Sequence, residues 1–123
     1  MALAKTVTHI IQNTSIGASS YYDSTSYVTL TDGIALAFDV SMLSSSSAEA
    51  GVRADVIASP DGTTWNTQVY DQFTVTFSSG TTEIYSQTFD VNPAPKYIKL
   101  RLTNLSTGSI ASACNVDSIV QSA

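Results

Sequence analysis

The chain has little of the chemistry on which most enzyme active sites depend. Its 123 residues include one histidine, His9, one cysteine, Cys114, and one tryptophan, Trp65. A single cysteine excludes an intrachain disulfide, and nothing beside Cys114 in the sequence is a base that would activate its thiol. A serine–histidine–acid triad would have to use His9, which lies far from any serine paired with an acid. We therefore expect a non-enzymatic protein with no catalytic residue.

Motifs for cofactors and metals are also missing. Gly80 and Gly108 are isolated turn glycines, so the chain has no glycine-rich loop that would hold a phosphate group. The stretch DGTTWN at 61–66 resembles the start of a calcium loop, but further carboxylates at alternating positions are absent. We expect neither a cofactor nor a metal ion.

Charge is scarce and mostly acidic. Charged residues make up 12% of the chain, and the net charge is −5. We expect neither nucleic acid nor a membrane surface as partner, because both require a large basic face. The start MALAKTVTHIIQ does not read as a signal peptide, and no apolar run approaches the ~18 residues of a membrane span. Synthesis in a reducing cytoplasm fits these features. The five basic residues are scattered: Lys5, Arg53, Lys96, Lys99 and Arg101.

The chain is rich in hydroxyl groups, and its apolar and polar side chains alternate with a period of two residues. It has 19 serines and 16 threonines, which suit loops and half-buried strands. We expect one domain over 1–123, an all-β, antiparallel, two-sheet β-sandwich that is jelly-roll-like with eight or nine strands. The eight or nine strands are expected within ten candidate segments: 3–12, 27–30, 34–43, 52–59, 65–70, 73–77, 83–91, 96–104, 110–114 and 116–121.

The alternation also predicts which side chains face the core. Residues 52, 54, 56 and 58 share one face, as do 85, 87, 89 and 91. In the strand KYIKLRLTN the residues at 98, 100 and 102 face inward, and Lys99 and Arg101 face outward. The segment 78–82 is predicted to be a hairpin loop with Gly80 at positive φ, and SSSSAEAG at 44–51 to be a flexible loop.

The turn at Ser59–Gly62 leads to Trp65, whose role has two interpretations. An indole near the start of a strand can fill a sandwich core or a subunit contact, and we favour this interpretation. Alternatively, Trp65 and nearby tyrosines form a flat platform on which a sugar ring stacks. The candidate platform residues are Trp65, Tyr70, Tyr21 and Tyr22.

Three stretches together resemble a known group of proteins. They are AKTVTHIIQNTSI near the start, SPDGTTWN in the middle, and PKYIKLRLTNLSTGSIASACNVDSIV near the end. They resemble small structural proteins of tailed bacteriophages and related viruses, which decorate capsids or form head and tail appendages. The resemblance implies a β-sandwich or jelly roll, made in the host cytoplasm and located in the virion, with no catalytic residue.

The resulting hypothesis is a capsid decoration or appendage subunit that acts through protein–protein contacts. We expect a homo-oligomer, with a trimer as the leading guess, bound to a viral capsid or tail protein. Residues 1–12 are the candidate contact strand, with Leu3, Val7, Ile10 and Ile11 as contact residues, although this strand could equally pair within its own sandwich. Two alternatives stay open: a carbohydrate-binding or adhesion module that binds a glycan, and a self-assembling filament or surface-layer subunit.

Overall fold

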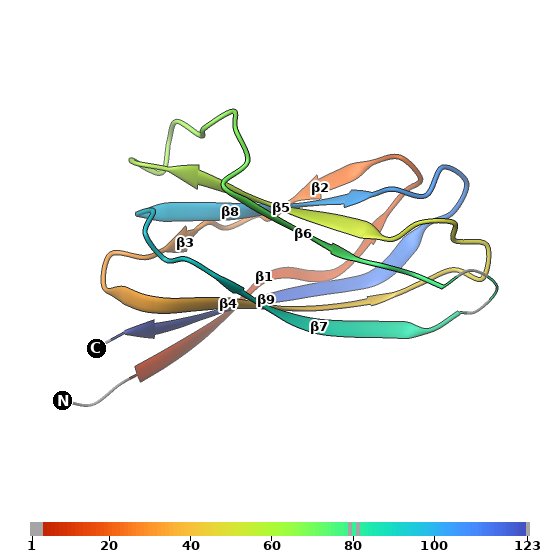
Figure 1. Ribbon diagram of the computed structural model, residues 1–123, viewed down its shortest axis with the longest axis horizontal. Helices are drawn as coiled ribbons and strands as arrows, with labels where there is room; N and C mark the ends of the chain where they lie inside the picture. Colours follow the sequence, from red (N-terminus) through yellow and green to blue (C-terminus); the bar gives the residue numbers. More distant parts are fainter. Residues whose placement is uncertain (1–3, 79, 81, 123) are drawn as a thin grey trace.

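Two facing layers of β-strands make up the computed structural model, which describes residues 4–78, 80 and 82–122 (Figure 1). The described residues contain no helix, and therefore no helix that could cross a membrane. The nine strands are β1 (Ala4–Ile16), β2 (Tyr21–Asp23), β3 (Val28–Thr29), β4 (Gly33–Leu43), β5 (Val52–Ser59), β6 (Asp71–Val75), β7 (Ile84–Val91), β8 (Tyr97–Asn104) and β9 (Ala111–Ser122).

The strand order identifies the layers as a jelly roll. One sheet has four strands in the order β1-β9-β4-β7. The other has five, in the order β2-β8-β5-β6, with β3 also paired to β8. Every pairing is antiparallel. The chain passes repeatedly from one sheet to the other, as in double-sheet jelly rolls. The predicted class, an antiparallel two-sheet β-sandwich with eight or nine strands, is confirmed.

The core lies between the sheets and follows the alternation in the sequence. Phe38 on β4 and Ile98, Leu100 and Leu102 on β8 are fully buried and face inward. Val52, Ala54, Val56 and Ala58 on β5 also belong to the core. Removing apolar surface from water stabilises a fold by about 25 cal/mol per Å². Burial of these side chains is therefore the main contribution to the stability of the sandwich. The predicted inward faces of β5 and β8 are therefore correct.

Three local predictions are wrong. Residues 65–70 form bends and irregular backbone instead of a strand, and β6 begins only at Asp71. Residues 21–23, which none of the candidate strands included, pair with β8 as the short edge strand β2. The segment after β6 is no hairpin, because β6 pairs with β5 in one sheet and β7 with β4 in the other. Gly80 within this crossover does have the predicted positive φ, at 87°.

The segment 44–51, predicted to be flexible, is attached to the body of the protein. Ala48 is 2% exposed and belongs to the core. The Ser44 N–H donates to the Glu83 carbonyl at 2.9 Å. Glu49 accepts hydrogen bonds from the backbone N–H and the hydroxyl of Thr107. Contacts that a serine run does not reveal in the sequence therefore hold this segment in place.

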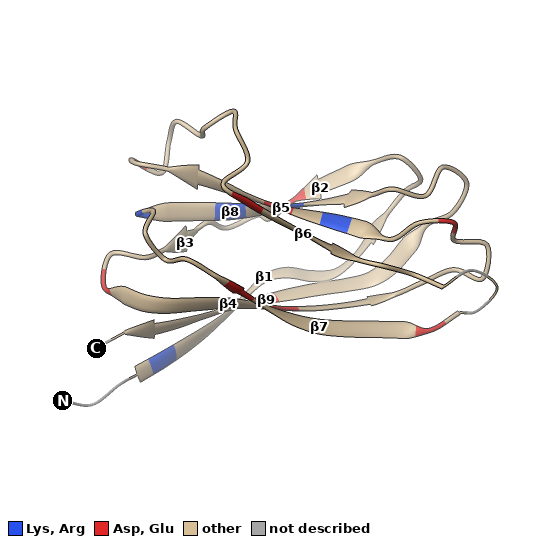
Figure 2. Ribbon diagram, viewed as in Figure 1, with Lys and Arg blue, Asp and Glu red and all other residues tan. Residues whose placement is uncertain are grey.

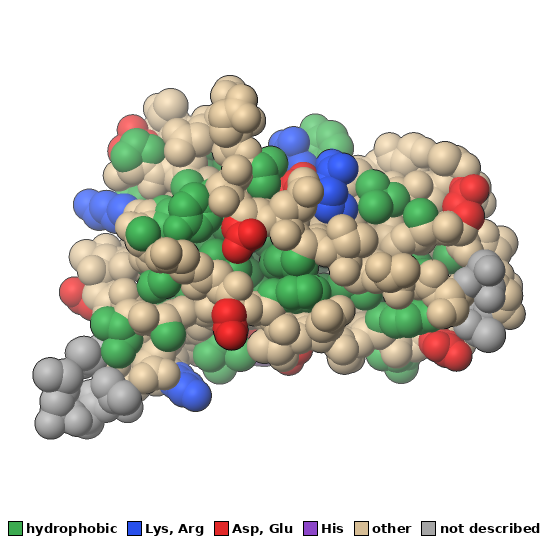
Figure 3. Space-filling model, viewed as in Figure 1, with side chains coloured by type: hydrophobic (Ala, Val, Ile, Leu, Met, Phe, Trp, Pro, Cys, Tyr) green, Lys and Arg blue, Asp and Glu red, His purple; other side chains and the backbone are tan. Residues whose placement is uncertain are grey.

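The sandwich has two long flanks, and they differ in chemistry. On the flank of β6 and β7, Phe73 stacks on Phe89 with ring centroids 3.6 Å apart. Figure 3 shows apolar side chains between the two layers on this side of the molecule. The opposite flank lies between β1 and β3, where threonine and serine residues predominate and Tyr27 is the one aromatic residue among the described residues of the lining. One flank is thus closed by aromatic packing and the other is lined by hydroxyl groups.

Candidate interaction surfaces

The turn after β5 is held by its own side chains. Asp61 Oδ1 accepts the N–H groups of Thr63 and Thr64, each at 2.8 Å. These two donors hold the pKa of Asp61 below its usual value, since they stabilise the ionised carboxylate. Gly62 has a φ of 77°, and Ser59 Oγ accepts its N–H at 2.9 Å. Asp61 thus holds the turn through its side chain, and Gly62 adopts the positive φ that the turn requires.

Trp65, just beyond this turn, lies on the outer side of the five-stranded sheet. The Lys99 ammonium nitrogen is 5.0 Å from the centroid of the indole ring. Lys99 belongs to the outward face of β8, between the inward-facing Ile98 and Leu100. The prediction that Trp65 fills the core is therefore wrong, because the chain turns back over the sheet after β5 instead of continuing as a strand. The indole is half-buried, and its use in a subunit contact stays a prediction.

Alternating aromatic and cationic side chains cover this outer face. We call the set the aromatic–cationic strip. Within the strip, Tyr27 lies 5.9 Å from Trp65 and 5.2 Å from Tyr97, centroid to centroid. The Arg101 guanidinium lies 4.2 Å from the Tyr21 ring. Cation–π contacts at such distances add about 0.5–1 kcal/mol each on an exposed surface. The strip comprises Tyr21, Tyr27, Trp65, Tyr97, Lys99 and Arg101.

Asp23 connects the cations of the strip. Its carboxylate accepts two hydrogen bonds from Arg101, at 2.6 and 3.1 Å, and lies 3.9 Å from the Lys99 nitrogen. The hydrogen bond from Arg101 is the main reason that the pKa of Asp23 lies below its usual value. The same pair raises the pKa of Arg101. The strip is thereby fixed in geometry before any partner binds.

Basic residues gather on this side of the protein. Arg53 on β5 and Lys99 and Arg101 on β8 all belong to the five-stranded sheet, and Lys96 directly precedes β8. Figure 2 shows these basic segments together in that layer, with one further basic segment near the start of β1. Asp55 accepts a hydrogen bond from Gln72 at 2.7 Å and lies 3.3 Å from Arg53, which partly balances the charge. The sequence positions alone had suggested scatter.

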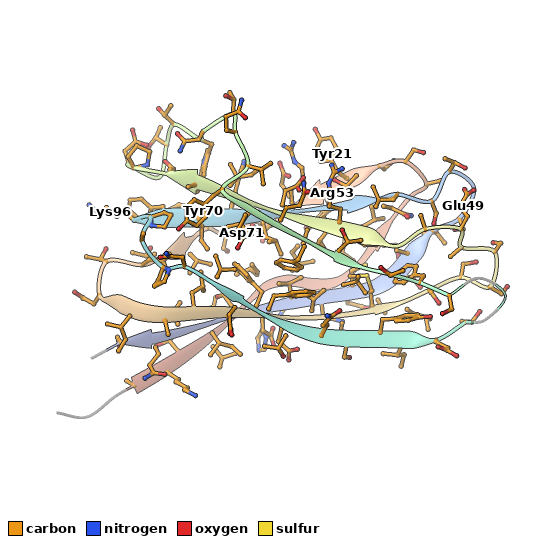
Figure 4. The ribbon with its side chains drawn as sticks, viewed as in Figure 1. Tyr21, Glu49, Arg53, Tyr70, Asp71 and Lys96 are labelled. Atoms are coloured by element: carbon orange, nitrogen blue, oxygen red, sulfur yellow. The ribbon has the colours of Figure 1, made fainter. Side chains whose placement is uncertain are left out.

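The four predicted platform residues do not form one surface. Tyr21 is 61% exposed and belongs to the strip with Trp65. Tyr22 packs against the core. Tyr70 donates its hydroxyl to the Asn92 carbonyl at 3.1 Å, and in Figure 4 it lies toward the end of the molecule that carries Lys96, away from Tyr21. Sequence reasoning missed Tyr97, although its alternation with Lys99 and Arg101 indicates an outward direction.

The first strand provides a second surface. β1 is an edge strand that pairs with β9 alone, from Ala4 opposite Ser122 to Ile16 opposite Ala111. Val7 is 55% exposed on the outer face, opposite Ile119 of β9. Ile119 in turn pairs with Ala37 of β4, so small and apolar side chains continue across the sheet. We call β1 with Val7 the β1 edge.

Of the three predicted contact residues that the structure describes, Val7 alone is exposed. Ile10 and Ile11 are 1% and 2% exposed, since a register shift at this point turns both into the protein's own core. They cannot reach a partner while the sandwich is intact. Leu3 lies outside the described residues. A partner-contact role for the start of the chain therefore stays a prediction that depends on Val7 and the unpaired backbone of β1.

The described histidine, cysteine and acidic residues are the side chains from which a metal centre would be built. Within the described part of the chain, no cluster of three or more histidine, cysteine or acidic residues has the geometry of a metal site. His9 Nδ1 forms a hydrogen bond with Asp117 Oδ1 across β1 and β9, on the outer face. Cys114 is buried, and burial raises the pKa of its thiol to about 11. A thiol with that pKa stays protonated and unreactive at neutral pH.

Comparison with known proteins supports the fold. No family model matches the chain, and no curated protein matches it. The prophage-derived protein YomS of SPBc2 has a similar structure, with a TM-score of 0.53 and 12% identity, over 99% of this chain and 96% of YomS. VP2 of the infectious bursal disease virus subviral particle gives 0.56 and 10%, over 96% of this chain and 32% of VP2.

A carbohydrate-binding module has the same fold. The CBM36-1 domain of a multidomain xylanase, from the hindgut metagenome of Trinervitermes trinervoides, gives a TM-score of 0.54 and 12% identity. The match covers 94% of this chain and 96% of that domain. Phage-derived, viral and carbohydrate-binding proteins are thus all structural neighbours. At these identities the similarity establishes a shared β-sandwich, and function has to be argued from the surfaces.

Proposed function

We propose that this chain is a non-enzymatic structural subunit of a virion, either a capsid decoration protein or a head or tail appendage. The observation that carries the proposal is the β1 edge. A 13-residue strand at the end of a sheet presents unpaired backbone groups, and here an exposed valine accompanies them. Such an edge tends to pair with another chain unless something covers it.

The fold is compatible with this proposal. YomS, which is prophage-derived, shares the fold over nearly the whole of both chains, and VP2 builds a subviral particle. A surface subunit has no need of a catalytic centre. Its contribution is burial of partner surface, which stabilises a shell by mass action. The proposed partners are further copies of this chain, with a trimer as the leading guess, and a viral capsid or tail protein.

The test is the solution mass of the purified protein, measured by light scattering across a dilution series. We expect a stable closed oligomer well above 13.0 kDa. Val7→Lys should reduce that mass, because it places a charge on the β1 edge. Val69→Lys is the matched control, since Val69 is the same residue type and is 44% exposed in the segment between β5 and β6, two strands of the other sheet.

Three results would contradict parts of the proposal. A monomer at every concentration would refute the homo-oligomer. Polymers that grow with concentration would support the filament or surface-layer alternative, in which the interface does not close. If Val69→Lys abolishes the oligomer and Val7→Lys does not, the homo-oligomer stands, but the β1 edge is not its interface.

A carbohydrate-binding module is the second candidate function. The aromatic–cationic strip supports it, because exposed, prearranged rings can stack on the apolar face of a sugar. The fold shared with the CBM36-1 domain is compatible with it. Titration with neutral oligosaccharides while the fluorescence of Trp65 is recorded tests this function, and an unchanged spectrum with every sugar would count against it.

A further inference from the structure

The flank between β1 and β3 contains a groove of about 380 Å³. Its floor is the inward side of β1 and β9, and its rim is β3 with the turn that follows. The volume falls in the lower part of the usual range for small-molecule sites, roughly 300–1,000 Å³. The side chains that line it are mainly hydroxylic: Thr6, Thr8, Thr29, Thr31, Ser118 and Ser122, with Tyr27, Val28, Asp32 and Val120.

This groove exists because the five-stranded sheet covers little of β1. Thr8 lies opposite Ser118, and Thr6 lies opposite Val120, on the same side of the sheet as the core. Both threonines are nevertheless exposed. β3 has only two residues and is the nearest strand of the other sheet to line this flank. Little of the facing sheet covers the floor of the groove, so solvent or a ligand contacts it. For this reason the floor carries hydroxyl groups where a covered strand would carry leucine or valine.

Ser118 shows that the floor of the groove is unusual. Its side chain is 1% exposed, and Oγ has no hydrogen-bond partner among the described residues. A buried hydroxyl without a partner costs about 1–3 kcal/mol, so such groups are rare and call for an explanation. Phe38, the neighbour of Ser118 across β4, offers no polar atom. A ligand hydroxyl in the groove would provide the missing partner once the side chains that cover Oγ, such as that of Thr8 opposite Ser118, move aside.

We propose that this groove binds a neutral saccharide, with Ser118 and the threonines of β1 as its hydrogen-bonding floor and Tyr27 as its stacking residue. The inference rests on the second candidate function but moves the site away from the Trp65 face. The lining selects the ligand class. Among the described residues no basic side chain lines the groove, so a bound anion would have no opposite charge beside it. An apolar ligand would leave the hydroxyl groups of the lining without hydrogen-bond partners. Hydroxyls both donate and accept, which matches the hydroxyls of a sugar.

Tyr27 lies between the groove and the strip, because it precedes the inward-facing Val28 and its ring lies on the outer side with Tyr97. It is 50% exposed and lines the groove. Trp65 and Tyr97 contact its ring from the outer face, which holds the ring in position. Asp32, also in the lining, is an acceptor for sugar hydroxyls. A saccharide that extends beyond the groove would therefore meet Tyr27 first and the strip next.

The test uses four trisaccharides as probes: xylotriose, cellotriose, maltotriose and triacetylchitotriose. Each is titrated into isotopically labelled protein, and amide chemical shifts give the affinity and the location. We expect at least one probe to shift residues of β1, β9 and β3. Ser118→Ala should weaken that binding about tenfold, the equivalent of one hydrogen bond, and Tyr27→Ala should weaken it further.

Ser109→Ala is the matched control. Ser109 is also a buried serine with an unpartnered Oγ, but it does not line the groove. Both alanine variants should fold with unchanged or higher stability, because each removes an unsatisfied hydroxyl. Only Ser118→Ala should weaken binding. This separates a ligand contact from a structural effect.

The failures are distinguishable. A probe could bind but shift only the amide signals of the strip, with Trp65→Ala abolishing binding and Ser118→Ala leaving it unchanged. In that case the groove is not the saccharide site, and the second candidate function stands. Equal weakening in Ser118→Ala and Ser109→Ala would also overturn the groove. If no probe shifts any residue at about 10 mM, a concentration that detects even millimolar affinity, both fail. Neither result depends on the oligomer measured by light scattering.

Discussion

Asn104, at the end of β8, is the buried polar residue whose loss should cost most. Its side chain is 1% exposed. The amide nitrogen donates to the carbonyls of Ile16, Gly17 and Ser109, at 3.1, 3.3 and 2.9 Å. The amide oxygen accepts the N–H of Ser106 at 3.1 Å. One side chain thus holds the end of β1, the end of β8 and the loop before β9 together.

The magnitude follows from these contacts. Asn104→Ala leaves several buried backbone groups without this partner, and each such loss costs about 1–3 kcal/mol. Taking about 1 kcal/mol for each of the three shorter bonds, and about 1 for the lost volume, gives ~4 kcal/mol. A small domain has about 5–15 kcal/mol in total. With a urea m-value of about 1–3 kcal/mol/M, the midpoint should fall by roughly 2 M.

Equilibrium unfolding in urea, followed by circular dichroism, measures this effect. Asn115→Ala is the matched control, because Asn115 also bridges β1 and β9 through its amide but is exposed. Water can replace its bonds, so its loss should stay below about 1 kcal/mol. If Asn104→Ala loses no more than Asn115→Ala, the argument from buried hydrogen bonds is refuted.

Three further predictions concern acid stability, packing and reactivity. The lowered pKa of Asp23 stabilises the folded state above about pH 3.8, its usual value, and this contribution disappears as the pH falls through the lower folded-state value. The stability difference between wild type and Asp23→Asn should therefore shrink below pH 4 in urea titrations, and a difference constant down to pH 2 would contradict this. In Gly51→Ala the new Cβ would lie 1.7 Å from the Val75 carbonyl oxygen, so we expect a loss of about 3 kcal/mol or failure to fold; a urea midpoint equal to wild type would disprove the clash. Cys114, with its thiol pKa raised to about 11, should resist a disulfide reagent at pH 8 until urea is added, whereas rapid labelling of the native protein would show that it is accessible.

Regular alternation is the part of the fold that could be predicted from the sequence. β5 was predicted with its observed ends, and β8 within one residue, because each alternates along its whole length and is bounded by turn residues. The core faces of both strands followed directly. Alternation identifies a buried face, but it does not say which strand lies next to it. The crossover between β6 and β7 was therefore mistaken for a hairpin.

The candidate surfaces were harder to predict, because tertiary contacts create them. The position of Trp65 depends on where the segment after the turn folds back, which local propensity does not determine. Ile10 and Ile11 became core residues through a register shift that their sequence does not show. Ser118 and Thr8 look like ordinary strand hydroxyls, and only the uncovered flank between β1 and β3 gives them a possible role.

The pairing of β1 with β9 also has a mechanical consequence. Ala4 lies opposite Ser122, so both ends of the described chain leave the sandwich at the same corner, as Figure 1 shows. A force that pulls these ends apart acts perpendicular to β1 and β9. It breaks the hydrogen bonds between the two strands one after another, which is the unzipping geometry. Such a geometry yields at low force. A subunit under tension would therefore resist unfolding better if its partners bound the faces of its sheets than if the load were applied through its two ends.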